Sequence, residues 1–245
     1  MPLETVLIGI SGPSSSGKTT LSRLLRDIYP NTFILHEDDF YKTDAEIPVN
    51  EEGVQDWDCL EAIDLLAFQK ALKYVKEHGT SPPGFESKED QNEVGIVDVK
   101  QKTISELKDS ANTMNERSGS EETRIAIIDG FLLFSESMAS IRELFDVKIF
   151  LRTDFQTAKT RREARKGYVT LEGFWEDPPE YVDKVVWPNY VKDHAFMFED
   201  GDVEGRVAEG VTRSSAISVM PWELRQDLEG GLRWIVDVLQ PVLKP

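Results

Sequence analysis

An eight-residue motif near the N-terminus constrains the fold of this chain more than any other feature. Residues 12–19 read Gly-Pro-Ser-Ser-Ser-Gly-Lys-Thr and match the pattern G-x-x-x-x-G-K-[S/T]. An apolar run at 6–10, typical of a buried parallel strand, precedes the motif, and residues 20–29 follow it with leucines and an isoleucine at helical spacing. A strand, a glycine-containing loop and a helix in this order predict the first unit of a P-loop α/β fold.

The loop has the composition of a phosphate-binding site. Its glycines let backbone N–H groups converge on phosphate oxygens, and the N-terminus of the following helix favours negative charge. Lys18 would reach the β- and γ-phosphates of a nucleotide, and the hydroxyl of Thr19 would bind Mg²⁺. The simpler alternative is a Ser/Gly turn before a helix. The nucleotide-binding residues predicted here are Gly12, Pro13, Ser14, Ser15, Ser16, Gly17, Lys18, Thr19 and Thr20.

Further apolar runs predict the rest of one doubly wound domain. Strands that alternate with helices indicate a P-loop NTPase fold, with a central parallel β-sheet flanked by helices and a small lid at about 161–180. At 245 residues, a single domain over 1–245 is expected. Strands are predicted at 33–35, 125–129 and 147–151, and helices at 60–75, 138–144 and 154–165.

Residues from about 78 to 122, called the insertion below, are predicted to be partly disordered. They are rich in Ser, Gly, Pro and charged residues and show no sustained apolar periodicity. A strand at 95–99 and a short helix around 104–107 are the candidates for regular structure within them. Composition alone favours a solvated surface loop without chemistry.

Two carboxylates at the ends of predicted strands suit phosphoryl transfer to an alcohol. That reaction needs a group that accepts the hydroxyl proton and a carboxylate that helps to hold the metal. The carboxyl ends of parallel strands border the ligand crevice. We therefore predict that Asp129 binds Mg²⁺, directly or through water, and that Asp38 or Asp39 accepts the proton. The alternative for residues 37–39 is a turn that caps a helix.

The sequence Asp56-Trp57-Asp58 has two interpretations. One carboxylate can accept both vicinal hydroxyls of a ribose, and an indole face can stack on a flat cationic ring. Alternatively, Asp58 is the N-cap of the helix expected near Leu60, and Trp57 belongs to the core.

The charge balance limits the partners of the chain. Lys and Arg total 28 against 45 Asp and Glu, a net charge of −17, which would repel nucleic acid and anionic membrane surfaces. No segment approaches the length of an apolar membrane span. The single cysteine, Cys59, favours a reducing compartment, so we expect a cytoplasmic location, with the nucleus as the alternative. The oligomeric state, monomer or dimer, stays open.

Binding of anionic ATP by so acidic a protein requires a local concentration of basic residues. Such a cluster lies on and after the predicted helix at 154–165, and it is followed by a loop of aromatic residues and prolines. Arginines on a closing lid can stabilise charge on a transferring phosphoryl group and exclude water. A solvated helix face is the alternative. The cluster consists of Lys159, Arg161, Arg162, Arg165 and Lys166.

Several segments together resemble the nicotinamide riboside kinases, which belong to the uridine-kinase-like group of P-loop nucleoside kinases. The resemblance covers roughly residues 5–75 and 124–200. The P-loop alone is generic, but the other segments are more specific to this family. The segments are 8–21, 36–42 (His-Glu-Asp-Asp-Phe-Tyr-Lys), 57–62 (Trp-Asp-Cys-Leu-Glu-Ala) and 127–134 (Ile-Ile-Asp-Gly-Phe-Leu-Leu-Phe), extended by Arg161-Arg162 and by 186–190.

The resemblance implies a role for individual residues. Asp38 would be the catalytic proton acceptor and would lie near Mg²⁺, Thr19 would be a direct metal ligand, and Asp129 would be the third metal residue. Trp57 would stack on the nicotinamide ring, and Asp58 would bind the ribose hydroxyls. The remaining residues implied are Arg161 and Arg165 for the nucleotide, and Asp39, Phe40, Tyr41, Arg162 and the lid residue Tyr168 for the substrate.

The function that the resemblance implies is ATP-dependent phosphorylation of the 5′-hydroxyl of nicotinamide riboside, or of nicotinic acid riboside, for NAD synthesis. Mg²⁺ would be the cofactor, ATP the phosphoryl donor and a small nucleoside the acceptor. Two departures stand out. The family strand can end in glutamate where this chain has Asp129, and the long insertion is similar to that of fungal members. The alternatives are a uridine/cytidine-type nucleoside kinase and a non-catalytic ATP-binding regulatory protein.

Overall fold

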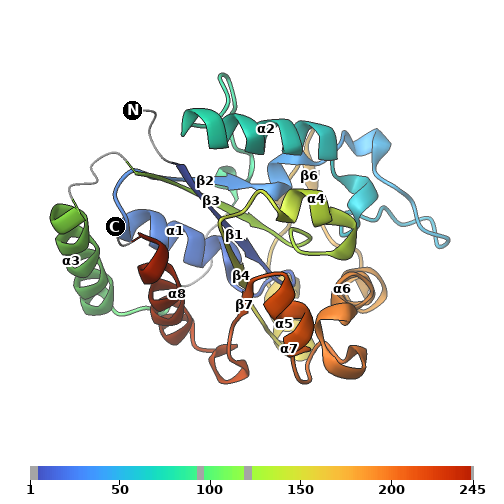
Figure 1. The fold of residues 1–245 in the computed structure, drawn as a ribbon. Coiled ribbons are helices and arrows are strands. Elements are labelled where there is room, and N and C mark those ends of the chain that lie inside the picture. The colour runs from blue at the N-terminus through green and yellow to red at the C-terminus, as the bar shows by residue number, and fades with distance from the viewer. Residues whose placement is uncertain (1–4, 93–96, 119–122, 244–245) are drawn as a thin grey trace.

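A five-stranded parallel sheet forms the centre of the computed structural model (Figure 1). The structure describes residues 5–92, 97–118 and 123–243. The strand order is β2-β3-β1-β4-β7, and every neighbouring pair is parallel. This sheet confirms the predicted P-loop α/β fold class. Its strands are β1 (Thr5–Ser11), β2 (Thr32–His36), β3 (Arg124–Gly130), β4 (Val147–Phe150) and β7 (Ile217–Val219).

Side chains that alternate along β1 face two separate cores. Leu7 points into the core beneath α2 (Leu65–His78), where Phe68 is fully buried. Ile8 belongs with Val6 and Ile10 to the opposite core, which α1 (Lys18–Ile28) and α8 (Leu228–Leu243) close (Figure 1). Because helices cover both faces, the strands are apolar along almost their whole length, as the sequence pattern predicted.

Helix boundaries differ more from the prediction than strand boundaries do. The helix expected from residue 60 begins only at Leu65, because the Asp64 carboxylate accepts the N–H of Ala67 (3.0 Å) and so caps α2, while Leu60–Ala62 forms a 3₁₀ turn. The helix predicted at 138–144 is only a single turn, α4 (Ala139–Arg142). The helix predicted at 154–165 is α5 (Phe155–Glu163).

Part of the insertion is a helix, α3 (Gln101–Ser118), which is longer than the predicted 104–107. Ile104, Leu107 and Ala111 recur at i, i+3 and i+7 and pack into the core that α1 and α8 close. This narrow apolar stripe is enough to dock the helix, although the composition around it is polar. The strand predicted at 95–99 lies partly outside the described residues, and 97–99 are not in a strand.

The C-terminal third supplies a small hairpin and further short helices. Strands β5 (Tyr168–Val169) and β6 (Phe174–Trp175) pair antiparallel within the segment 161–180, called the lid below. In the described part of the chain, no helix is both long and apolar enough to span a membrane. The remaining helices are α6 (Trp187–His194) and α7 (Glu209–Ser214).

Candidate active site

The P-loop lies at the carboxyl end of β1, and two glycines shape its backbone. Gly12 has a φ of 143°, and a Cβ there would lie 2.6 Å from the carbonyl oxygen of Leu151, so no other residue fits without displacement. Gly17, with a φ of 99°, leads directly into α1. The unpaired N–H groups at the start of α1 therefore face the loop, which is the arrangement that binds phosphate.

Lys18 is held over this loop. Its ammonium donates to the carbonyls of Gly12 and Pro13, each at 3.0 Å. Burial lowers the pKa of Lys18, while the nearby charges of Asp38 and Asp129 oppose that shift. The side chain is thus a half-buried cation with acidic side chains near it at the P-loop end of the site.

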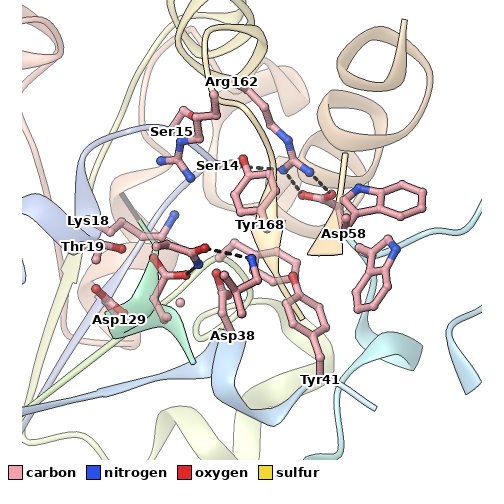
Figure 2. A pocket seen from close by; sticks show the side chains of 18 of the residues that line it. Ser14, Ser15, Lys18, Thr19, Asp38, Tyr41, Asp58, Asp129, Arg162 and Tyr168 are labelled. Carbon is pink, nitrogen blue, oxygen red and sulfur yellow. Dashed lines mark hydrogen bonds and ion pairs between the residues drawn. The ribbon is translucent and has the colours of Figure 1, made fainter. Parts of the chain in front are cut away.

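A pocket beside the P-loop collects most of the predicted site residues (Figure 2). In Figure 2, Lys18, Thr19 and Asp129 lie on one side, and Tyr41 and Asp58 lie on the other. The predicted residues that line the pocket are Ser14, Ser15, Gly17, Lys18, Thr19, Thr20, Asp38, Tyr41, Trp57, Asp58, Asp129, Arg162, Arg165 and Tyr168.

The structure separates the two candidates for the proton acceptor. Asp38 lines the pocket, and burial, followed by the charges of Glu89 and Glu37, raises its pKa well above the ordinary value. Asp39 points elsewhere: its Oδ1 accepts the backbone N–H groups of Lys88 (2.7 Å) and Glu89 (3.0 Å). Asp39, predicted to contact substrate, therefore does not line this pocket, because its carboxylate anchors the insertion.

Phe40 also requires a correction. Its ring packs against Phe68 at 5.0 Å and Phe85 at 5.6 Å, and only 8% of the residue is exposed. It belongs to the core and is not part of the pocket lining. Its neighbour Tyr41 does line the pocket, as predicted.

Asp129, the next-to-last residue of β3, lines the pocket and is oriented by a histidine. His36 Nδ1 lies 2.6 Å from Asp129 Oδ1. Burial alone would lower the pKa of His36, but the charge and hydrogen bond of Asp129 raise it to about 9. Asp129 Oδ2 is buried and has no hydrogen-bond partner among the described residues.

These groups fit a Mg²⁺ ion that is shared with a nucleotide. In the described residues, no group of three or more His, Cys, Asp or Glu side chains could hold a metal by itself. Mg²⁺ commonly takes one or two carboxylates together with phosphates and water. The Thr19 hydroxyl and the carboxylates of Asp38 and Asp129 line the same pocket, and the unpaired Oδ2 of Asp129 offers a ligand or an acceptor for bound water.

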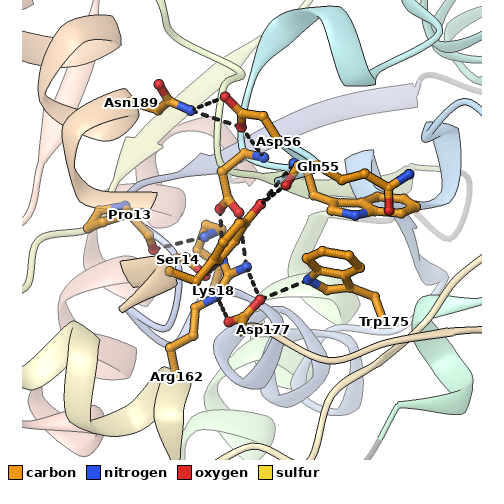
Figure 3. A network of polar contacts seen from close by, with 12 residues as sticks. Pro13, Ser14, Lys18, Gln55, Asp56, Arg162, Trp175, Asp177 and Asn189 are labelled. Carbon is orange, nitrogen blue, oxygen red and sulfur yellow. Dashed lines mark hydrogen bonds and ion pairs between the residues drawn. The ribbon is translucent and has the colours of Figure 1, made fainter. Parts of the chain in front are cut away.

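Arg162 joins three parts of the site (Figure 3). It makes a two-point ion pair with Asp58 (2.7 and 2.9 Å) and another with Asp177 (2.6 and 3.1 Å). It also donates to the Ser14 hydroxyl at 2.9 Å, so all five of its N–H groups are used. Asp58 is therefore not the N-cap of a helix, because it is bound to Arg162 and Asp64 caps α2.

Trp57 is both a core residue and part of the pocket wall, so the structure agrees in part with each interpretation. The residue is only 4% exposed and packs with Ile47 and Ala62, as expected of a core residue, yet it lines the pocket. Its ring contacts Tyr41 edge-on at 5.3 Å and Trp175 at 5.7 Å. This end of the pocket is therefore aromatic.

Three loop residues predicted to bind nucleotide, Gly12, Pro13 and Ser16, do not line this pocket, and neither does Arg161. The Arg161 guanidinium donates to the carbonyl of Ser15 (3.3 Å) and so contacts the P-loop from outside.

Several residues that line the pocket were not predicted from the sequence. Trp175 follows the basic cluster in the lid, which was a usable signal, whereas no sequence pattern pointed to Glu89 or Asn92.

A P-loop, acidic groups facing Lys18 and a pocket for a small acceptor define a P-loop kinase of small molecules. The chain is 39% identical to a nicotinamide riboside kinase of Schizosaccharomyces pombe over 98% of this chain and 100% of that protein. It is 36% identical to the enzyme of the same name from Saccharomyces cerevisiae over 82% of each chain. The chain belongs to the nicotinamide riboside kinase family. Both of these relatives are fungal, in agreement with the predicted resemblance.

Other comparisons are less informative. A solved sugar kinase structure from Janibacter sp. overlaps 98% of this chain and 99% of its own at 12% identity, with a TM-score of 0.46. That overlap is too loose to bear on fold or function. No protein-family model matches the chain.

Proposed function

We propose that this protein transfers the γ-phosphoryl group of ATP to the 5′-hydroxyl of nicotinamide riboside and so forms nicotinamide mononucleotide for NAD biosynthesis. Nicotinic acid riboside is the second acceptor to consider. The observation that carries the proposal is the layout of one pocket. A phosphate site and a carboxylate lie at one end, and a second carboxylate with aromatic rings lies at the other.

At the phosphate end, the P-loop amides and Lys18 would bind the β- and γ-phosphates. Arg165, which stacks on Tyr168 at 5.3 Å, would add positive charge from the lid. Thr19, Asp38 and Asp129 would hold Mg²⁺, which neutralises phosphate charge when bound. Together these groups orient the γ-phosphate toward the centre of the pocket.

At the acceptor end, Asp58 would accept hydrogen bonds from the two vicinal ribose hydroxyls, because Arg162 fixes the orientation of its carboxylate. Trp57 and Trp175 supply indole surface for the cationic nicotinamide ring. A riboside held this way directs its 5′-hydroxyl toward Asp38. The raised pKa of that half-buried carboxylate makes it a stronger base than an exposed aspartate.

The test is a turnover assay with a panel of acceptors. Purified protein, ATP and Mg²⁺ are mixed separately with nicotinamide riboside, nicotinic acid riboside, uridine and cytidine, and the mononucleotides are measured by mass. We expect the nicotinamide mononucleotide product, and we expect Asp38→Asn still to bind ATP but to lose about 10²-fold or more in turnover. Phosphorylation of uridine alone would replace the substrate and keep the class. ATP binding without transfer to any acceptor would indicate a regulatory protein.

A further inference from the structure

The insertion forms one wall of the pocket. Glu89 and Asn92 line the pocket together with Lys18, Asp38 and Asp129. The 3₁₀ turn Glu89–Gln91, which Asn92 follows, is fixed from two sides. Besides the two hydrogen bonds to the Asp39 carboxylate described above, Arg23 of α1 donates to the carbonyl of Glu89 at 3.2 Å. The turn is therefore attached both to the segment that carries Asp38 and to the helix that follows the P-loop.

Asn92 orients the Glu89 carboxylate and ties it to the lid. The Asn92 amide Nδ2 donates to Glu89 Oε2 at 2.6 Å, and Asn92 Oδ1 accepts the N–H of Val169 in β5 at 2.9 Å. The hydrogen bond from Asn92 uses Oε2 and does not involve Glu89 Oε1. Glu89 is thus a held, half-buried carboxylate with one oxygen left for a ligand in the pocket.

The charges at this end of the pocket call for a cation. Asp38, Glu89 and Asp129 converge there, while Lys18 and Arg165 are the basic residues in the lining nearby. After burial, the charge of Glu89 is the largest influence that raises the pKa of Asp38. Asp129 contributes the buried Oδ2 without a partner. Three carboxylates would repel the phosphates of ATP unless a divalent cation lay between them.

We infer that Glu89 is a further carboxylate of the magnesium site, supplied by the insertion, which accepts hydrogen bonds from water molecules bound to the ion. Mg²⁺ releases its water reluctantly and usually keeps several molecules of it, and each of these needs an acceptor. The inference deepens the proposed function, because it rests on binding of ATP with Mg²⁺ at this pocket. Asn92 would act as a positioning residue, since it holds the Glu89 carboxylate in place.

Calorimetric titration of ATP, with excess Mg²⁺ and with EDTA, tests this inference without any acceptor nucleoside. For Glu89→Gln, loss of the charge should weaken binding of the magnesium complex by about fivefold and tighten binding of metal-free ATP by a similar factor. The ratio of the dissociation constant of metal-free ATP to that of the magnesium complex should therefore fall about 25-fold relative to the wild type. Glu89→Asp keeps the charge and should retain most of the ratio.

The matched control is Glu86→Gln, the same substitution at an exposed position of the same segment. It should leave both dissociation constants unchanged. An unchanged ratio in Glu89→Gln, or an equal change in Glu86→Gln, would overturn the role of Glu89. Wild-type protein that binds ATP without any magnesium dependence would also overturn it. Wild-type protein that binds no ATP would contradict the proposed function itself, so the two failures are distinguishable.

Discussion

Comparing substitutions of the two acidic partners of Arg162 should show which carboxylate only stabilises the fold and which one also recognises the substrate. Asp58→Asn and Asp177→Asn each remove one of two matched carboxylates that bind this guanidinium at two points. Only Asp58 lines the pocket. Both changes should destabilise the fold, and only Asp58→Asn should directly weaken binding of the nucleoside.

The size of the first effect follows from burial. Arg162 and Asp58 are 7% and 5% exposed, and breaking a buried pair of this kind costs about 3–5 kcal/mol when the remaining charge has no partner. Here the other carboxylate still pairs with Arg162, so we expect a loss of about 2–3 kcal/mol for each variant. For a chain of this length that corresponds to a fall of about 4–12 °C in the thermal unfolding midpoint.

Thermal unfolding and steady-state kinetics measure the two effects separately. Loss of a charged acceptor for ribose hydroxyls should raise the nucleoside KM about tenfold or more in Asp58→Asn, while Asp177→Asn should stay within about threefold of the wild type. An equal rise of KM in both variants would refute direct recognition by Asp58 and leave it only the task of holding Arg162. Unchanged unfolding midpoints in both would refute the ion-pair network.

Two further variants test the packing behind the site. Burial lowers the pKa of His194 to about 4, so between about pH 6.5 and 4 only the unfolded chain takes up a proton at this residue. The free energy of unfolding should therefore be full above this range and about 2 kcal/mol lower at pH 5. Urea titrations should find this loss in the wild type and not in His194→Leu. A Cβ at Gly130 would lie 2.6 Å from that of Glu37, so Gly130→Ala should cost about 1–3 kcal/mol in thermal unfolding, whereas Gly210→Ala, with open space around it, should not destabilise the fold.

The parts of the fold that could be predicted are those with a local signal. The P-loop is a contiguous motif, and strands β1, β3 and β4 are short apolar runs because helices cover both of their faces. Asp129 and Asp38 could be placed near the loop from topology alone, since parallel strands end at the same edge of the sheet.

The parts that could not be predicted depend on partners far away in the chain. Asp58 was equally compatible with a helix cap and a ligand site until its pairing with Arg162, 104 residues later, was known. Glu89 lies in a polar segment whose composition is that of a solvated loop. Hydrogen bonds to Asp39, about 50 residues earlier in the chain, and to Arg23 of α1 hold Glu89 at the pocket.

The segment Glu37–Phe40 explains why one run of acidic residues has three different environments. It is a 3₁₀ turn, in which successive side chains point about 120° apart and residues i and i+3 share a face. Glu37 and Phe40 therefore both point inward, where Glu37 accepts the N–H of Leu132 at 3.0 Å and Phe40 enters the core. The two remaining directions lead Asp38 into the pocket and Asp39 to the insertion. A shift of one residue in this turn would move Asp38 out of the pocket and Asp39 away from the insertion. The position of the proposed proton acceptor and the position of Glu89 therefore depend on the same local geometry.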